Sequence, residues 1–166
     1  MPETACLVVD GQDAQEDGEG LLVEHLARRI FRHVVRLPYF PASERAWTMT
    51  WFSGHTSLYR SKRLASLETR RGSSFYRVGT LAGHRSELLV LSSCVGLDPR
   101  ADWDVKGARW VISHQGALTH TSALVFAACF VPLLRVWRAH LLEDNVQAAF
   151  HAARRASASR GWRFRP

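Results

Sequence analysis

Residues 87–100, ELLVLSSCVGLDPR, decide the fold class that the sequence predicts. Five of the first eight residues are apolar without helical spacing, and Gly96 and Pro99 follow, a pattern typical of a fully buried strand that ends at a turn. A strand in the middle of a sheet needs a covering layer on each face, and the amphipathic segments 20–34 and 132–153 supply two helices for that purpose. We therefore expect a three-layer α/β domain with a mostly parallel central sheet flanked by helices.

The other elements are expected from the spacing of apolar side chains. Alternating or continuous apolar runs predict strands, and apolar residues at i, i+4 spacing predict helices. The segment 122–131 is apolar throughout; we expect a buried strand, and a buried helix is the alternative because periodicity does not separate the two. The remaining expected strands are 5–10, 34–39, 47–52 and 110–113, the last at the sheet edge, and the remaining expected helices are 56–71 and 75–83.

The chain length of 166 residues predicts one domain, which we place at 1–153, with a basic aromatic C-terminal tail at 154–166. The three cysteines, Cys6, Cys94 and Cys129, lie in apolar runs without CxxC spacing. This pattern indicates neither a disulfide framework nor a zinc site, and it favours a reducing compartment.

The N-terminus and the longest apolar stretch bear on localisation. No basic segment precedes the first apolar run, unlike in a signal peptide. The stretch 123–134 is about a dozen residues long, and a membrane-spanning helix needs roughly 20. We expect a cytoplasmic protein that does not enter the membrane.

Charge is distributed unevenly along the chain. Residues 1–24 hold seven acids and no Lys or Arg, whereas the remainder holds 22 basic and 8 acidic residues. That excess suits a polyanion, because phosphate contacts supply most non-specific affinity for nucleic acid. The alternative is a compositional bias without function, since 20 of the 22 basic residues are Arg. The candidate nucleic-acid contacts are Arg60, Lys62, Arg63, Arg70, Arg71, Arg154, Arg155, Arg160, Trp162 and Arg163, with Trp162 expected to stack on bases.

Carboxylates follow two of the expected strands. Asp10 ends the first strand, and Glu19 opens the helix after it. Because parallel strands bring their carboxyl ends to one edge of a sheet, these acids are expected to meet those that follow the central strand. Oxygen ligands of this kind bind Mg²⁺, which supports phosphodiester chemistry, although acids are also frequent in surface loops without a site. The candidate catalytic residues are Asp10 and Glu19, and the candidate metal ligands are Asp10, Asp98, Asp102 and Asp104.

The order of these features resembles the toprim-like proteins of bacterial mobile-element and phage-defence neighbourhoods. The resemblance covers about residues 5–110, and it is carried by segments in a fixed order rather than by rare motifs. These segments are Val8-Val9-Asp10-Gly11-Gln12, the acidic loop ending at Glu19, the helix 22–31, the patch Arg60-Ser61-Lys62-Arg63-Leu64 and the strand LLVLSSCVGLDP.

The resemblance implies a metal-dependent nuclease or a related nucleic-acid-processing enzyme. In that family the first acid acts as general acid/base and an Asp-x-Asp motif binds Mg²⁺; Asp10 matches the first acid. Ser93 and Val95 stand where the two aspartates are expected, and the nearest acid is Asp98. Either the site uses later acids, or the chain keeps the fold as a non-catalytic module that binds nucleic acid or a partner protein.

A second resemblance belongs to a different class. The apolar segment 117–134, followed by a second helix and Arg160-Gly161-Trp162, is similar to the central hairpin and Gly-Trp end of viral cell-death regulators of the Bcl-2 type. That alternative implies an all-helical binding protein. It lacks the Asn-Trp-Gly-Arg motif, and the run at 5–10 fits a strand better.

Overall fold

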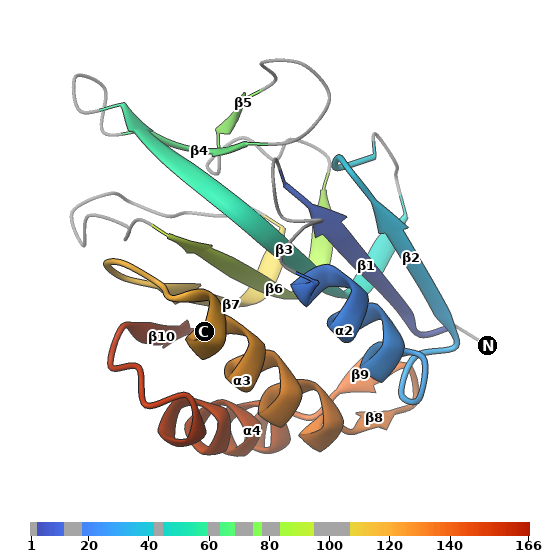
Figure 1. The fold of residues 1–166 in the computed structure, drawn as a ribbon. Coiled ribbons are helices and arrows are strands. Elements are labelled where there is room, and N and C mark those ends of the chain that lie inside the picture. Colours follow the sequence, from blue (N-terminus) through green and yellow to red (C-terminus); the bar gives the residue numbers. More distant parts are fainter. Residues whose placement is uncertain are drawn as a thin grey trace.

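A computed structural model describes residues 3–11, 18–41, 45–59, 64–68, 75–77, 84–94 and 107–166, with backbone alone for residues 56–59, 64–68, 75–77 and 94. The central sheet has the strand order β10-β7-β6-β3-β1-β2, and only the pairing of β10 with β7 in this path is antiparallel (Figure 1). The prediction of an α/β protein with a mostly parallel central sheet is confirmed. The strands are β1 (Ala5–Asp10), β2 (His33–Leu37), β3 (Ala46–Tyr59), β6 (Arg85–Cys94), β7 (Ala108–His114) and β10 (Trp162–Arg165).

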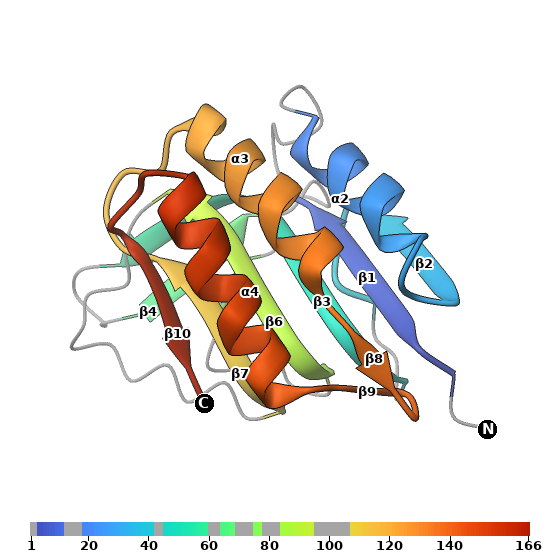
Figure 2. The same ribbon diagram turned by 90° about the horizontal axis from the view of Figure 1, so that it is seen from below.

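Three α-helices lie side by side on one face of this sheet (Figure 2). They are α2 (Glu19–Ala27), α3 (His120–Phe130) and α4 (Glu143–Ala156). A 3₁₀ turn, η2 (Val131–Leu133), and a small hairpin, β8 (Val136–Trp137) and β9 (His140–Leu141), connect α3 to α4. Within the described residues, no helix has the length and apolar character that crossing a bilayer requires.

Apolar side chains cover both faces of the sheet. In β1, Cys6 and Val8 belong to the core beneath the helices, whereas Leu7 and Val9 belong to a second apolar cluster on the opposite face together with Phe40. This alternation follows from the two-residue period of a strand, and each large side chain buried in this way contributes about 2 kcal/mol. A sheet buried on both faces is consistent with the expected three-layer fold, but the described helices all pack on one face rather than one on each, as segments 20–34 and 132–153 were expected to do.

The segment 122–131 forms α3, so the expectation of a buried strand is wrong and the helical alternative holds. Thr119 caps the helix, because its hydroxyl accepts a hydrogen bond from the Ser122 backbone N–H at 3.2 Å. The buried residues Ala123, Phe126, Ala127 and Phe130 follow i, i+3, i+4, i+7 spacing. The segment is apolar almost all round because α3 packs on the sheet and is flanked by α2 and α4 (Figure 2).

The expected long helix 132–153 is broken into several elements. Pro132 lies in η2, and Arg138 and Ala139 adopt positive φ angles of 48° and 71° in the β8–β9 hairpin. The Leu141 N–H donates to Glu87 Oε2 at 3.2 Å, which ties this hairpin to β6. A helix resumes only at Glu143, so its first turn carries acids that favour a helix N-terminus.

Three other expected helices also differ from the structure. The helix expected at 20–34 ends at Ala27, because His33–Leu37 pair with β1 as β2. The segment expected as a helix at 56–71 includes the end of β3, which pairs antiparallel with β4 (Leu64–Glu68). β5 (Phe75–Arg77) pairs with β4 where the helix 75–83 was expected to begin. Pairing with distant strands outweighs the local helical spacing in each case.

The C-terminal segment belongs to the domain and is not a tail. Residues 154–156 end α4, and Trp162–Arg165 form β10, which pairs with β7 along Val111–His114. β7 is therefore an interior strand, not the expected edge strand.

Candidate active site

The topology directs attention to the carboxyl ends of β1 and β3. From β1 the chain passes to β2 on one side and then returns to β3 on the other, which gives the parallel order β2-β1-β3-β6-β7. Ligands of open α/β sheets bind outside the carboxyl ends of the strands, where the order reverses in this way. The side chains at these strand ends are therefore the first candidates for function.

Asp10, at the end of β1, lies at this edge but is held by an ion pair. Its Oδ2 accepts a hydrogen bond from Arg36 Nε at 2.6 Å, and its side chain is almost completely buried. A Cβ on Gly20 would lie 1.9 Å from Asp10 Oδ1, so only glycine leaves room for the carboxylate beside the start of α2. Asp10 therefore joins β1, β2 and α2, and a metal ion would have to compete with a guanidinium for it.

Glu19, in the first turn of α2, is buried at the same edge. Its Oε1 accepts from Trp51 Nε1 and its Oε2 accepts from the Ser53 hydroxyl, both at 2.9 Å. Burial raises the pKa of this carboxyl above its ordinary value, although Ser92, Ser53, Trp51 and the charge of His120 act in the opposite direction. Glu19 thus connects α2 to β3 just before that strand leaves the core.

His55, four residues before the end of β3, and Cys94, the last residue of β6, occupy neighbouring positions. They are register partners in the parallel pairing, two residues beyond the partners Ser53 and Ser92. Register partners share one face of a sheet, with strands about 4.8 Å apart. Two-residue periodicity places both positions on the face of Trp51 and Val90, which belong to the core beneath the helices.

Cys94 differs from the other two cysteines in its place in the fold. Cys6 is buried in mid-strand, where burial raises the pKa of its thiol and makes it unreactive. Cys129 is half-buried within α3. Cys94 alone ends a strand at the carboxyl edge, opposite His55, whose side chain is exposed. A cysteine and a histidine brought together in this way are the components of a nucleophile and its base.

Two helices begin near the same edge. α2 begins at Glu19, which contacts Trp51 and Ser53, and α3 begins at His120, whose charge acts on Glu19. A helix N-terminus carries partial positive charge and unsatisfied backbone N–H groups. Together they create a field that favours negative charge at this edge of the sheet.

The acid-rich site predicted from sequence is only partly visible. Asp98, Asp102 and Asp104 lie outside the described residues. Asp10 and Glu19 lie at the same edge of the sheet, but each carboxyl is already bound by side chains of the neighbouring strands. Over the ranges that are described, no three His, Cys, Asp or Glu side chains are grouped to hold a metal ion.

Of the predicted nucleic-acid contacts, some lie outside the described residues and the others lie within them. Arg60, Lys62, Arg63, Arg70 and Arg71 lie outside the described residues. Arg154, Arg155, Arg160 and Arg163 gather where α4 passes into β10. Trp162 has no accessible surface and belongs to the core, so the prediction that it stacks on bases is wrong.

The sequence analysis missed the pairing of His55 with Cys94. The signals were the short polar ends Ser53-Gly54-His55 and Ser92-Ser93-Cys94, each following a buried apolar run. Only the register between β3 and β6 shows that the two ends meet. In comparisons with known proteins, no protein-family model and no curated protein matches this chain.

Proposed function

We propose that the protein is a thiol hydrolase that cleaves an amide, peptide or ester bond, with Cys94 as nucleophile and His55 as general base. The observation that carries the proposal is the register of these two residues on adjacent parallel strands. Neighbouring strands of a sheet lie about 4.8 Å apart, and register partners share one face, so the fold puts a cysteine position next to a histidine position. This edge is also where α/β sheets bind their ligands.

The chemistry uses only groups that the fold brings to this edge. His55 takes the thiol proton, the Cys94 thiolate attacks the carbonyl carbon, and the carbonyl electrons move onto oxygen. The proposal assigns stabilisation of that oxyanion to backbone N–H groups at the beginnings of α2 and α3. The oxyanion then collapses, the imidazolium protonates the leaving amine or alcohol, and the acyl group stays on Cys94 as a thioester. A water activated by His55 hydrolyses this thioester, which releases the acid and regenerates the thiol.

A buried hydrogen bond supports β3 near His55. Ser53 lies two residues before His55 and donates to Glu19. Ser92, two residues before Cys94, lies near the same carboxyl and acts to lower its pKa. Glu19 is therefore proposed as a positioning residue that fixes β3 relative to α2.

Nucleic-acid processing with Mg²⁺ stays a prediction, as does the non-catalytic binding module. The described residues favour the Mg²⁺ chemistry less than the thiol hydrolase, because the guanidinium of Arg36 already binds the Asp10 carboxylate. The hydrolase proposal involves no metal.

Alkylation by iodoacetamide, followed site by site with mass spectrometry between pH 5 and pH 9, tests the nucleophile. We expect Cys94 to react at neutral pH at least ten times faster than Cys129, and the His55→Ala variant to lose that advantage. The side chain of His55 is exposed, so its removal should leave the fold intact. Equal reactivity of Cys94 and Cys129, or no effect of His55→Ala, would reject the proposal.

Hydrolysis of p-nitrophenyl acetate tests turnover. Activity should fall by roughly 10²–10⁴-fold in Cys94→Ala and His55→Ala and be unchanged in the matched control Cys129→Ala. It should also be equal in Mg²⁺ and in chelator. Hydrolysis that persists in Cys94→Ala would show that another group is responsible.

A further inference from the structure

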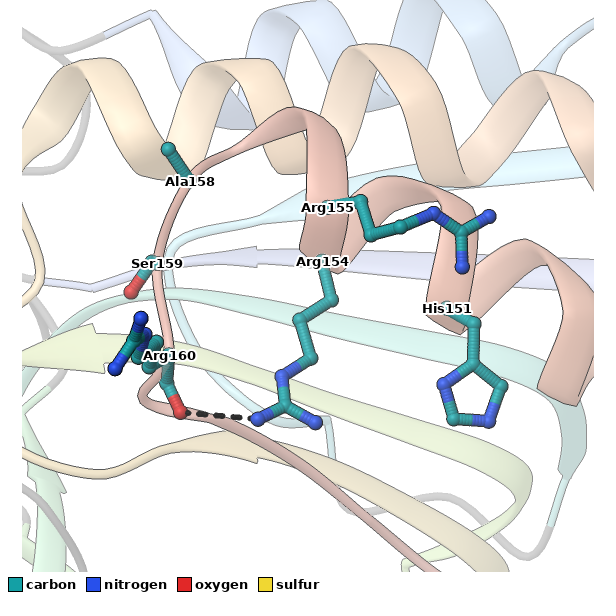
Figure 3. A pocket seen from close by; sticks show the side chains of 6 residues that line it. All are labelled: His151, Arg154, Arg155, Ala158, Ser159 and Arg160. Atoms are coloured by element: carbon teal, nitrogen blue, oxygen red, sulfur yellow. Dashed lines mark hydrogen bonds between the residues drawn. The ribbon is translucent and has the colours of Figure 1, made fainter.

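A basic pocket lies where α4 ends and the chain turns toward β10. It has a volume of about 300 Å³ and is lined by His151, Arg154, Arg155, Ala158, Ser159 and Arg160. Figure 3 shows these side chains on the last turns of α4 and on the connection that follows it. Nothing in the hydrolase chemistry of His55 and Cys94 requires this pocket.

The connection that carries Arg160 is held in place by hydrogen bonds. The Ser159 hydroxyl pairs with His114 Nε2 at 2.7 Å, and Arg154 Nη2 donates to the Arg160 carbonyl at 3.4 Å (Figure 3). A Cβ on Gly161 would lie 2.4 Å from both the Gln115 carbonyl oxygen and the His114 ring, so the chain passes very close to the end of β7. The pocket is therefore built into the fold rather than formed by loose side chains.

The positive charge of this pocket has no acidic ion-pair partner among the residues that the structure describes. Across the described parts of the chain, no carboxylate forms an ion pair with Arg154, Arg155 or Arg160. The sequence contains no Asp or Glu after Asp144. The end of α4 offers a partial negative charge of about 0.5, which offsets only part of three guanidinium charges. A bound anion would relieve their mutual repulsion.

The charge continues from the pocket along β10. Trp162 and Phe164 pack in or against the core beneath the helices, so alternation places Arg163 and Arg165 on the opposite face of the strand. Five arginines thus lie around β10, with Arg154, Arg155 and Arg160 near the helix side and Arg163 and Arg165 on the other face of the strand. Such an arrangement suits anions repeated along a chain better than one small anion. Guanidinium groups bind phosphate through paired hydrogen bonds.

We propose that this pocket and the adjoining face of β10 bind the phosphate backbone of a nucleic acid. The proposal is independent of the hydrolase; it keeps Arg154, Arg155, Arg160 and Arg163 from the expected nucleic-acid contacts and adds Arg165. Because Trp162 is buried, no aromatic side chain of this segment reads bases, and binding depends on phosphates alone. DNA and RNA strands of any sequence should therefore bind with similar affinity.

Fluorescence anisotropy with a labelled 20-nucleotide single strand, titrated with salt, tests the proposal. Replacing Arg155 and Arg160 by Gln should weaken binding at least tenfold at low salt. It should also reduce the slope of log affinity against log salt by about 1.4, at roughly 0.7 for each lost phosphate contact. The double variant Arg28→Gln/Arg29→Gln on α2 removes the same charge elsewhere and should bind like the wild type.

The competing occupants give different results. Polyglutamate that binds as tightly as the oligonucleotide and displaces it would overturn the proposal in favour of an acidic protein partner. Inorganic phosphate that displaces the oligonucleotide at equal phosphate concentration would indicate a small-anion site instead. Absence of binding at low salt, or equal loss in both double variants, would also overturn it. Cys94→Ala should bind normally, so failure of one proposal leaves the other standing.

Discussion

Trp162 stacks on Phe126 with ring centroids 3.8 Å apart and ring planes inclined by 16°. This contact joins β10, the last strand, to the middle of α3, and both side chains are fully buried. The segment expected as an exposed tail is thus part of the core, and its aromatic residues contribute to folding rather than to binding.

Replacement of Trp162 by Ala should reduce the free energy of unfolding by about 3–5 kcal/mol, because it leaves a large cavity in contact with Phe126. Chemical denaturation measures this loss. Trp162→Phe should cost much less, since it keeps a ring and removes a buried indole N–H that has no hydrogen-bond partner in the described structure. A stable Trp162→Ala variant that has lost nucleic-acid affinity would contradict the assignment of this residue to the core.

Loss of Arg36 should leave the Asp10 carboxylate buried without its cation. We expect Arg36→Met to destabilise the protein by about 3–5 kcal/mol, the range found when one member of a buried ion pair is removed. The double variant Arg36→Met/Asp10→Asn should recover much of this loss. Thermal unfolding of the wild type, Arg36→Met, Asp10→Asn and the double variant provides the measurement. No recovery would show that Asp10 depends on other partners.

The buried carboxyl of Glu19 should make stability decrease as the pH rises. Burial raises its pKa above 4.5, so the folded state holds the proton more tightly than the unfolded state. The stability associated with the neutral carboxyl is complete below pH 4.5 and is lost as the pH rises through the folded pKa. The stability of Glu19→Gln relative to the wild type should therefore be greater at pH 8 than at pH 4. Chemical denaturation of both proteins at the two pH values measures this difference. A stability difference that does not change with pH would contradict the raised pKa.

His84 should have the opposite effect in a different pH range. Burial lowers its pKa from 6.5 to about 4; its Nε2 pairs with the Thr50 hydroxyl at 2.8 Å, and its ring meets Phe40 edge to face. The contribution of neutral His84 to stability is complete above pH 6.5. It is lost as the pH falls toward 4, which lowers the free energy of unfolding by up to about 3 kcal/mol. His84→Gln should flatten this part of the profile. His114, whose pKa burial also lowers, should retain a smaller slope of the same sign.

The sequence alone predicted the strands that are buried on both faces. The runs at 5–10 and 87–93 are apolar on both faces of a strand, so local pattern and tertiary environment agree. The sequence also placed Asp10 and Glu19 at the ends of the correct elements, because a strand followed by an acidic loop and an amphipathic helix is a local unit.

Prediction from local spacing failed for a helix that other helices cover on most sides, and for strands that pair with segments distant in the sequence. The segment forming α3 is apolar on most sides because neighbouring helices cover it, which hides the helical period. The segment 33–37 continues the spacing of α2, but pairing with β1 makes it a strand. Alternation of Arg and aromatic residues at 162–165 suggested an exposed binding tail, although the same two-residue period is that of a strand that buries one face.

What the sequence by itself determined, therefore, is the fold class, the central strand, the first strand with its helix, and the strong excess of positive charge. Only the tertiary structure decided that His55 and Cys94 meet, because 39 positions separate them and no local pattern encodes the register of β3 with β6. It also decided that Trp162 is core and that Arg154, Arg155 and Arg160 surround one pocket. The spacing of residues along the sequence indicates local structure over a few residues. A site is assembled by strand order and register, which depend on the whole chain.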